Sequence, residues 1–420
     1  MMSAARLARG HRLATAEGAV ESVAPGLFRV RSASGRGSYG VRQDGLRWTC
    51  ECADYREWQR ACKHVAAVVE FFAVIAGVPW PHAAAAEALP DRPTYSQDWP
   101  AYDAAQQAEH PMFDALLWDL LTPIPDPPRP VGTPGRAPIP LRVQLFCAIR
   151  KVHSMESSRR ARGLLLALNR PGTGLLAHVP SYMTPSRLFR NPTATPCLLD
   201  LIHRSAEPLR EVEEGGTVGV DSSGFCTTCR GAYCTERYDP RRTHRWLKAH
   251  LSVGTKTHIV LDARVTDEHG ADAPLFLPLL RGAQASGIHF AEAVGDKAYL
   301  SRENLDGAAE LGLDPFVPFK SNSTPKSGGS RLWRKKYLEF QLHREEFDEH
   351  YHDRSNVEST ISAIKRKLGE PLLSKDPLAR VNELLSKLMA YNLGVMIHEA
   401  YEHHIEVGVP TPDLDRPYAE

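Results

Sequence analysis

At 420 residues, with 42% hydrophobic and 24% charged side chains, the chain can bury a sizeable core and form two or three domains. Its 51 lysine and arginine residues nearly balance 50 acidic residues, which excludes a general positive field as the basis of nucleic-acid binding. Eight cysteines in a chain of this length exclude a disulfide-dense scaffold and favour a reducing compartment.

No targeting or membrane-spanning segment is expected. Residues 1–20 contain arginines but lack the apolar stretch of a secretory signal. The longest apolar run, Val65–Val78, is interrupted by Glu70 and is too short to span a bilayer. We therefore expect a cytoplasmic protein without a membrane partner.

Residues 1–78 are expected to form a small unit of short strands followed by one helix. Leu27–Ser32, Ser38–Val41 and Leu46–Cys50 have strand composition and are separated by Gly/Ser turns. From His64 to Ile75, apolar side chains recur at helical spacing.

This unit contains four ligand-type residues in two closely spaced pairs, Cys50 with Cys52 and Cys62 with His64. Thiolate and imidazole ligands suit a tetrahedral, structural Zn²⁺ site. The first pair faces one side of a strand because strand side chains alternate, and the second lies at a helix start, where the dipole favours thiolate. We expect one zinc ion that stabilises the fold of this unit and leaves no coordination position open for catalysis.

The C-x-C…C-x-H pattern, with Trp48 before it and an apolar helix after it, resembles the SWIM-type zinc finger over about residues 27–78. That resemblance implies an accessory module that binds DNA or protein. A second thiol group has no fourth ligand at a convincing spacing apart from His244, so metal binding stays open for Cys226, Cys229 and Cys234.

Two proline-rich stretches follow, Gly77–Pro111 and Thr122–Pro140, and together they predict a linker over residues 79–140. A helical pattern then extends over residues 141–214. Strand patterns begin near Gly215 and alternate with helical segments, which predicts an α/β domain over residues 215–405 and a tail over 406–420. The predicted strands are Thr217–Asp221, Leu247–Val253, His258–Val265, Ala291–Gly295 and Phe316–Phe319.

The helical stretch from Tyr351 to Glu402 begins with the most informative pattern. At about 100° per residue, four polar side chains share a sector of about 60°; they are Tyr351, Arg354, Glu358 and Lys365. An adjacent apolar stripe predicts that the helix packs on a core. A carboxylate among cations suits metal and phosphate ligands, although an ordinary surface helix with i,i+4 ion pairs has the same spacing.

The spacing Tyr-x2-Arg-x3-Glu-x6-Lys resembles the YREK signature of bacterial insertion-sequence transposases with a DDE triad. Upstream, TVGVD ends at Asp221 and AVGD ends at Asp296, and both resemble the aspartate-bearing strand ends of that family. The resemblance spans about residues 140–400. It implies a ribonuclease-H-like mixed sheet with flanking helices, preceded here by a helical region and a small ββα-type zinc finger.

The resemblance also implies an activity, DNA transposition, with Asp221, Asp296 and Glu358 as catalytic residues. These acids would hold two Mg²⁺ ions, for which Mn²⁺ can substitute, and such ions stabilise the attacking and leaving oxygens of a phosphodiester. Contacts with DNA phosphates are expected from Tyr351, Arg354 and Lys365. The expected partners are double-stranded DNA, at inverted-repeat ends and at the target, and a second copy of the chain on the DNA.

Several alternatives stay open at this point. Asp262, Asp267 and Asp272 are rival acids, and Trp333 in a basic loop either stacks on a displaced base or belongs to the core. The basic stretches 150–162 and 331–336 are either DNA contacts or solvated faces. A repurposed transposase that only binds DNA, or a nuclease that joins no strands, would preserve the same motifs.

Overall fold

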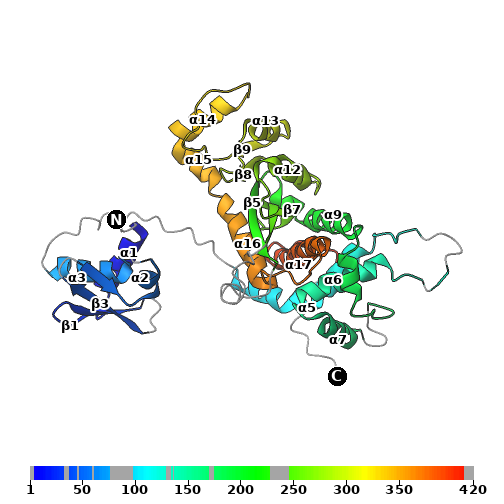
Figure 1. The fold of residues 1–420 in the computed structure, drawn as a ribbon, viewed down its shortest axis with the longest axis horizontal. Coiled ribbons are helices and arrows are strands. Elements are labelled where there is room, and N and C mark those ends of the chain that lie inside the picture. The colour runs from blue at the N-terminus through cyan, green and yellow to red at the C-terminus, as the bar shows by residue number, and fades with distance from the viewer. Residues whose placement is uncertain are drawn as a thin grey trace. The chain divides into compact units, whose positions relative to one another are not determined.

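The computed structural model describes residues 4–32, 37–44, 47–58, 61–75, 98–128, 134–135, 137–169, 175–227 and 246–410. The chain divides into two compact units, residues 1–97 and 98–420, and each has its own hydrophobic core (Figure 1). Cys229, Cys234 and His244 lie outside the described residues. None of the described helices combines the length and apolar character needed to cross a membrane.

The first unit is a four-stranded antiparallel sheet in the order β1-β2-β3-β4, covered by helices. Buried Phe28, Val30 and Val41 alternate with exposed polar residues, so one face of the sheet packs against the helices. The three expected strands and the expected helix are present. The remaining strand and the first helix were not expected. The elements are α1 (Ala4–Thr15), β1 (Val20–Ala24), β2 (Leu27–Arg31), β3 (Ser38–Asp44), β4 (Arg47–Cys50), α2 (Ala53–Trp58) and α3 (Lys63–Ile75).

The second unit begins with helices, and the first of them corrects the expected linker over residues 79–140. Residues Trp99–Leu121 form α5, a 23-residue helix. Asp98 caps it by accepting a hydrogen bond from the Ala101 N–H, and Pro100 lies in the first turn, where a missing N–H costs little. The buried face of α5 includes Met112 and Phe113. Four helices follow, α6 (Leu141–His153), α7 (Ser158–Leu168), α8 (Thr184–Phe189) and α9 (Ala194–Ala206), in line with the expected helical region.

A five-stranded mixed sheet forms the centre of this unit, in the order β7-β6-β5-β8-β9. β6 is antiparallel to both of its neighbours, β5 and β7, whereas β8 is parallel to β5 and to β9. The expected mixed α/β architecture is therefore confirmed. The short helices η1 (Glu207–Leu209) and α10 (Arg210–Glu213) precede the sheet, whose strands are β5 (Thr217–Cys226), β6 (Trp246–Gly254), β7 (Val260–Asp267), β8 (Glu292–Gly295) and β9 (Asp314–Phe316).

Helices flank the sheet. Among them, α12 contacts β5, β6 and β7, and α16 contacts β5 and β6 (Figure 1). Their apolar stripes account for this packing, since Phe276, Leu279 and Leu280 of α12 are buried, as are Val357, Ile361 and Ile364 of α16. The helices of this part are η2 (Ala273–Leu275), α12 (Phe276–Gln284), α13 (Arg302–Glu310), α14 (Trp333–Leu342), α15 (Arg344–Tyr351), α16 (Arg354–Leu368) and α17 (Pro377–Glu402).

The expectation of an uninterrupted helix from Tyr351 to Glu402 is wrong. The chain leaves α16 at Gly369, whose φ of 74° favours glycine, and α17 starts only after the cap at Asp376. α17 then packs against α5, α6 and α9. Its Asn392 side chain pairs with both backbone groups of Val260, at 3.0 Å and 2.7 Å, and so satisfies the edge of strand β7.

Candidate functional site

The two predicted aspartates lie side by side at one end of the sheet. Val220 of β5 is in register with Gly295 of β8, and the strands are parallel, so Asp221 and Asp296 occupy equivalent next positions. Each carboxylate is oriented by a nearby backbone amide: Asp221 accepts the N–H of Ser222 at 2.8 Å, and Asp296 accepts the N–H of Ala298 at 2.7 Å. The two aspartates thus lie on neighbouring strands where β8 ends, although β5 does not end at Asp221 as expected but continues to Cys226.

A glycine on β5 allows α16 to approach closely enough to bring Glu358 to the same edge. A Cβ at Gly219 would lie 2.2 Å from Cγ2 of Val357, so only glycine fits at this crossing. Because strand side chains alternate, Asp221 lies on the same face of β5 as Gly219. Glu358 follows Val357 on α16, and it is close enough to Asp221 for its charge to raise the pKa of that carboxyl.

Arg354 connects these two acids directly. Its Nη1 donates to Oδ2 of Asp221 at 3.1 Å, and its Nη2 donates to Oε1 of Glu358 at 2.7 Å. The Tyr351 ring centroid lies 5.7 Å from the guanidinium carbon. The Asp221 side chain is 15% exposed, whereas that of Glu358 is 56% exposed, so the site opens on the side of α16.

The electrostatics reflect this crowding of acids. Burial raises the pKa of Asp221, and the charges of Asp296 and Glu358 raise it further, against the lowering effect of Ser222 N–H and Arg354. Burial opposes the charge of Arg354, but the neighbouring Tyr351, Glu358 and Asp221 raise its pKa. The Arg354 cation therefore partly offsets a concentration of negative charge.

Lys365 does not join this group. It lies about 10 Å farther along α16, where its ammonium group pairs with Glu370 at 3.2 Å and lies 5.3 Å from the Phe225 ring centroid. Tyr351 ends α15, whereas Arg354, Glu358 and Lys365 lie on α16, and of these four residues only Lys365 is away from the acids of the sheet.

The donor set fits a hard divalent cation, since three carboxylates from β5, the end of β8 and α16 supply the oxygen ligands that Mg²⁺ and Mn²⁺ prefer. The carboxylate oxygens of the three acids do not converge as closely as the ligand atoms of a bound metal, because the Arg354 guanidinium group lies between Asp221 and Glu358. In the described part of the chain, a converged group of three or more metal-ligating residues occurs only in the first unit.

One acid near the site, Asp272, was seen in the sequence only as a rival to the other aspartates. Its Oδ1 accepts from the Ser222 hydroxyl at 2.8 Å, directly beside Asp221. Lys248 pairs with Asp272 at 2.7 Å, and Nδ1 of the buried His250 lies 3.2 Å from it. Lys248 and His250 are two residues apart on β6, so their side chains lie on the same face of the sheet. This spacing is the sequence signal that could have indicated polar residues beside the acidic site.

The two other rival acids and Trp333 make structural contacts within the fold. Asp262 is fully buried between His203 and Arg264, and Asp267 binds the backbone N–H of His269. Trp333 is 6% exposed and donates its Nε1–H to the carbonyl of Thr324 at 2.7 Å, so it belongs to the core.

In the first unit, the four predicted zinc ligands converge. The ligand atoms of Cys50, Cys52, Cys62 and His64 all lie within 4.8 Å of one another, and all four residues are buried. Nδ1 of His64 is 3.8 Å from the Cys50 sulfur and 3.9 Å from the Cys62 sulfur. The hydrogen bond with Cys50 lowers the pKa of Cys62 to about 4, which favours a thiolate inside the cluster.

The local fold explains why these ligands meet. Cys50 ends β4 opposite Val41, the chain turns back at Cys52, and Cys62 and His64 lie at the start of α3. Soft sulfur and imidazole donors in a buried group of four fit Zn²⁺ with no open position. The aromatic ring of Tyr39 lies 4.7 Å from that of His64.

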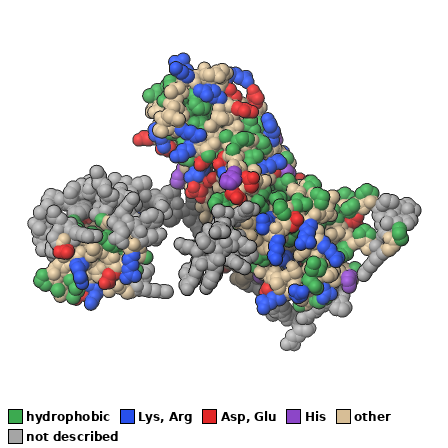
Figure 2. Space-filling model, viewed as in Figure 1, with side chains coloured by type: hydrophobic (Ala, Val, Ile, Leu, Met, Phe, Trp, Pro, Cys, Tyr) green, Lys and Arg blue, Asp and Glu red, His purple; other side chains and the backbone are tan. Residues whose placement is uncertain are grey.

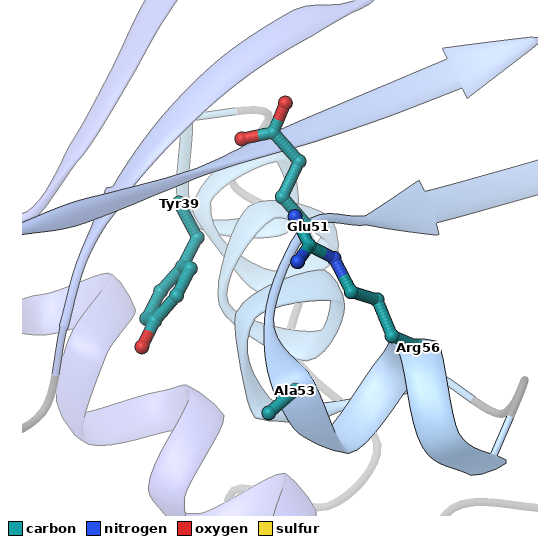
Figure 3. Close-up of a pocket in the computed structure, with 4 residues that line it drawn as sticks. All are labelled: Tyr39, Glu51, Ala53 and Arg56. Atoms are coloured by element: carbon teal, nitrogen blue, oxygen red, sulfur yellow. The ribbon is translucent and has the colours of Figure 1, made fainter.

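The surface next to the cluster is a shallow depression lined by Tyr39, Glu51, Ala53 and Arg56 (Figure 3). These residues come from β3, the turn after β4, and α2. The Glu51 carboxylate accepts the backbone N–H of Gly40 at 3.1 Å. Because the depression carries both an acid and a base, its charge favours neither an anion nor a cation.

The comparisons with known proteins bear on the second unit. No curated protein matches the chain. The family described as the transposase DDE domain matches residues 216–393, which begin just before β5 and end within α17. Asp221, Asp296 and Glu358 all fall inside the matched segment. The chain therefore contains, over residues 216–393, a region similar to transposase DDE domains, and this similarity supports a DDE-type transposase.

Proposed function

We propose that the chain is a DNA transposase that nicks the ends of its element by metal-dependent hydrolysis and joins the freed 3′-hydroxyl to target DNA. The observation that carries the proposal is the Arg354 bridge between Asp221 and Glu358, beside Asp296, within the segment that matches the transposase DDE domain family. Three acids and a guanidinium group at one open edge supply ligands for both a metal ion and a phosphate.

In this proposal, Asp221, Asp296 and Glu358 hold Mg²⁺, or Mn²⁺ in its place. Two such ions stabilise the attacking and leaving oxygens of a phosphodiester when they are bound. The charges of both Asp296 and Glu358 act on Asp221, so Asp221 would hold the metal together with each of the other two acids.

Arg354 and Tyr351 position the DNA. In the free protein, the Arg354 guanidinium group binds two carboxylates, and its planar donors are equally suited to phosphate oxygens. Arg354 therefore can pass from a carboxylate to the scissile phosphate when the DNA enters. Lys365 contacts a phosphate farther along the strand because it lies farther along α16.

The first unit is proposed to be a SWIM-like zinc-binding module with one structural Zn²⁺ on Cys50, Cys52, Cys62 and His64. The buried, converged ligand atoms support this assignment. Its proposed role is accessory binding of double-stranded DNA in the cytoplasm. Pairing of the two inverted-repeat ends requires two active sites, so we propose a homodimer on the DNA.

The proposal is tested with the purified full-length protein, Mg²⁺ and DNA from both flanks of its own gene. Glu358→Gln removes one acid, and Glu346→Gln on α15, where the side chain is 77% exposed, is the matched control. Nicks at a defined inverted repeat, followed by joined strands, are expected with the native and control proteins and not with Glu358→Gln. DNA that is bound but uncut by all three proteins would instead identify a DNA-binding protein, and cuts without joined products would identify a nuclease.

A further inference from the structure

A cavity of about 330 Å³ lies among α6, α7, α8 and the segment that leads into α17, away from the acidic site. Its lining combines three cations with four serines, and no carboxylate is found among the described lining residues. The residues on which the inference depends are Lys151, Ser157, Ser158, Arg190, Ser374 and Lys375.

The inference depends mainly on Lys151, whose side chain is largely buried and whose ammonium group has no counter-ion within the described residues. Its side chain belongs to a residue only 9% exposed, and it lines the cavity. Within the described residues, its ammonium group has no hydrogen bond or ion pair. Its nitrogen lies 6.0 Å from the centroid of the Phe189 ring, a distant cation–π contact. Its ammonium nitrogen is not among the buried atoms that lack a partner, so it remains accessible, and an anion in the cavity could pair with it.

Two other basic residues of α6, unlike Lys151, are paired with acids inside the fold. Arg150 pairs with Asp114 at 2.7 Å, and His153 pairs with Glu109 at 3.0 Å. The basic stretch from Arg150 therefore divides into side chains used inside the fold and one, Lys151, directed to the cavity. Burial lowers the pKa of nearby Lys387 to about 8, and the charge of Lys151 contributes to that shift.

The cavity also contains the N-terminus of a helix. Ser157 caps α7 without a side-chain hydrogen bond to the helix, so the first amides of this 11-residue helix have no side-chain partner. Helix N-termini favour anions because their amides and dipole point outward. Arg190 and Lys375 lie at the exposed rim, and neither has an ion pair within the described residues.

The position of the cavity relates it to α16. Glu358 and Leu368 are about 15 Å apart along this helix, which corresponds to roughly four nucleotide steps of a DNA strand. After Leu368 the chain enters the segment that lines the cavity, anchored by the Leu372 N–H on the carbonyl of Cys226 at 2.8 Å. Lys and Arg side chains gather on the face of this helical part in Figure 2.

We propose that this cavity binds a backbone phosphate of the DNA, several nucleotides from the phosphate at the acidic site. Lys151 supplies the positive charge, the α7 amides and serine hydroxyls donate hydrogen bonds, and Arg190 and Lys375 bind the adjacent backbone. The assignment of DNA as the ligand rests on the proposed function. The phosphate chemistry rests on the cavity itself.

The test measures the affinity of the full-length protein for duplex DNA as a function of salt, without divalent metal. Lys151→Met removes the charge and keeps the side-chain length, and Arg190→Gln changes an exposed residue that cannot disturb the core. Each variant is expected to weaken binding about 5- to 10-fold and to lower the slope of log K against log salt by about 1. The control Arg344→Gln, at an exposed site on α15, is expected to retain the native slope.

Native slopes for both cavity variants would overturn the proposal, as would an equal loss for Arg344→Gln. If Lys151→Met does not fold, Arg190→Gln decides the outcome. Inorganic phosphate is the second probe: stabilisation of the native protein but not of Lys151→Met, with unchanged DNA affinity in both, would identify a small-anion site and overturn the DNA assignment. A protein that never cleaves DNA yet shows the lower slopes would refute the proposed transposase and leave the phosphate site supported.

Discussion

Lys367 donates a 2.6 Å hydrogen bond to Glu109 and thereby joins α16, the helix of Glu358, to α5. The other carboxylate oxygen of Glu109 lies 3.0 Å from Nε2 of His153 on α6. One buried acid therefore connects α5 and α6 to α16, which follows them by about 200 residues in the sequence. The end of α16 opposite to the acidic site is fixed by this contact.

We predict that stability falls in acid because of Glu109. Burial alone would raise its pKa, but hydrogen bonds from His153 and Lys367 outweigh burial and lower the pKa to about 2. A lowered pKa means that the stabilisation is complete above the unfolded-state pKa near 4.5 and is lost as pH falls toward 2. Glu109→Gln should lower the free energy of unfolding by about 2–3 kcal/mol at pH 7 and by much less at pH 2–3.

Urea unfolding at both pH values measures this difference. Glu346→Gln serves as the control because its side chain is largely exposed, and it should change the free energy of unfolding by less than about 0.5 kcal/mol. A constant difference between Glu109→Gln and the native protein across this pH range would refute the link to ionisation.

We predict that Gly219→Ala disrupts the site without touching a polar residue. The new Cβ would overlap Cγ2 of Val357, so α16 must move away from β5. Overpacking of this kind costs about 1–3 kcal/mol, and the movement displaces Glu358 from Asp221. Thermal unfolding and the nicking rate should both decline.

The control for that change is Gly163→Ala in α7, where nothing lies within 4 Å of the added Cβ. There the substitution should stabilise the helix by about 0.5–1 kcal/mol. If both substitutions have the same effect on stability and nicking, the close crossing of α16 and β5 is not what positions Glu358.

We predict that Arg354→Lys reduces the nicking rate by about 10²-fold at saturating DNA. Lysine keeps the charge but cannot donate to Asp221 and Glu358 at once in the geometry of a guanidinium group. Arg366→Gln, on an exposed face of the same helix, is the matched control and should nick at the native rate once DNA is saturating. Native activity of Arg354→Lys would show that charge alone suffices at this position.

We predict that Cys62→Ser lowers the zinc content of the protein and unfolds the first unit, because a buried ligand is lost from a closed site. The second unit should keep its fold and its divalent-metal binding at Asp221, while binding to element ends weakens. Cys197→Ser changes a cysteine of α9 outside the cluster and should retain zinc. Equal zinc content and equal end binding in both variants would contradict the assignment.

Much of the acidic site could be predicted from sequence because each acid directly follows a strong local pattern. Asp221 and Asp296 continue apolar strands, and Glu358 lies on an amphipathic helix, so period and composition predicted these elements. The choice of these three acids over their rivals rested on the resemblance to DDE transposases. The helix rise already places Lys365 about 10 Å beyond Glu358, but its ion pair with Glu370 could not be predicted because Glu370 lies past the end of α16. The assignments of catalytic and metal-binding roles stay predictions.

The prediction of a linker over residues 79–140 was wrong because proline was treated only as a residue that ends helices. Pro100 and Pro111 suggested a linker, yet the first lies in the initial turn of α5, and the buried face of that helix packs against α17. Tertiary packing outweighed local preference there. The role of Asp272, which precedes η2, likewise depends on Ser222 of β5 and Lys248 of β6, and no local pattern around Asp272 contains that information.

The late position of α17 in the chain has a consequence for biosynthesis. This helix packs against α5, α6 and α9 and covers the edge of β7, so the core of the second unit stays incomplete until the ribosome has released residues up to Glu402. Until then, the nascent sheet exposes apolar surface and one unpaired edge, a state that favours aggregation and chaperone binding. The first unit has no such delay, since its described elements are all synthesised by Ile75.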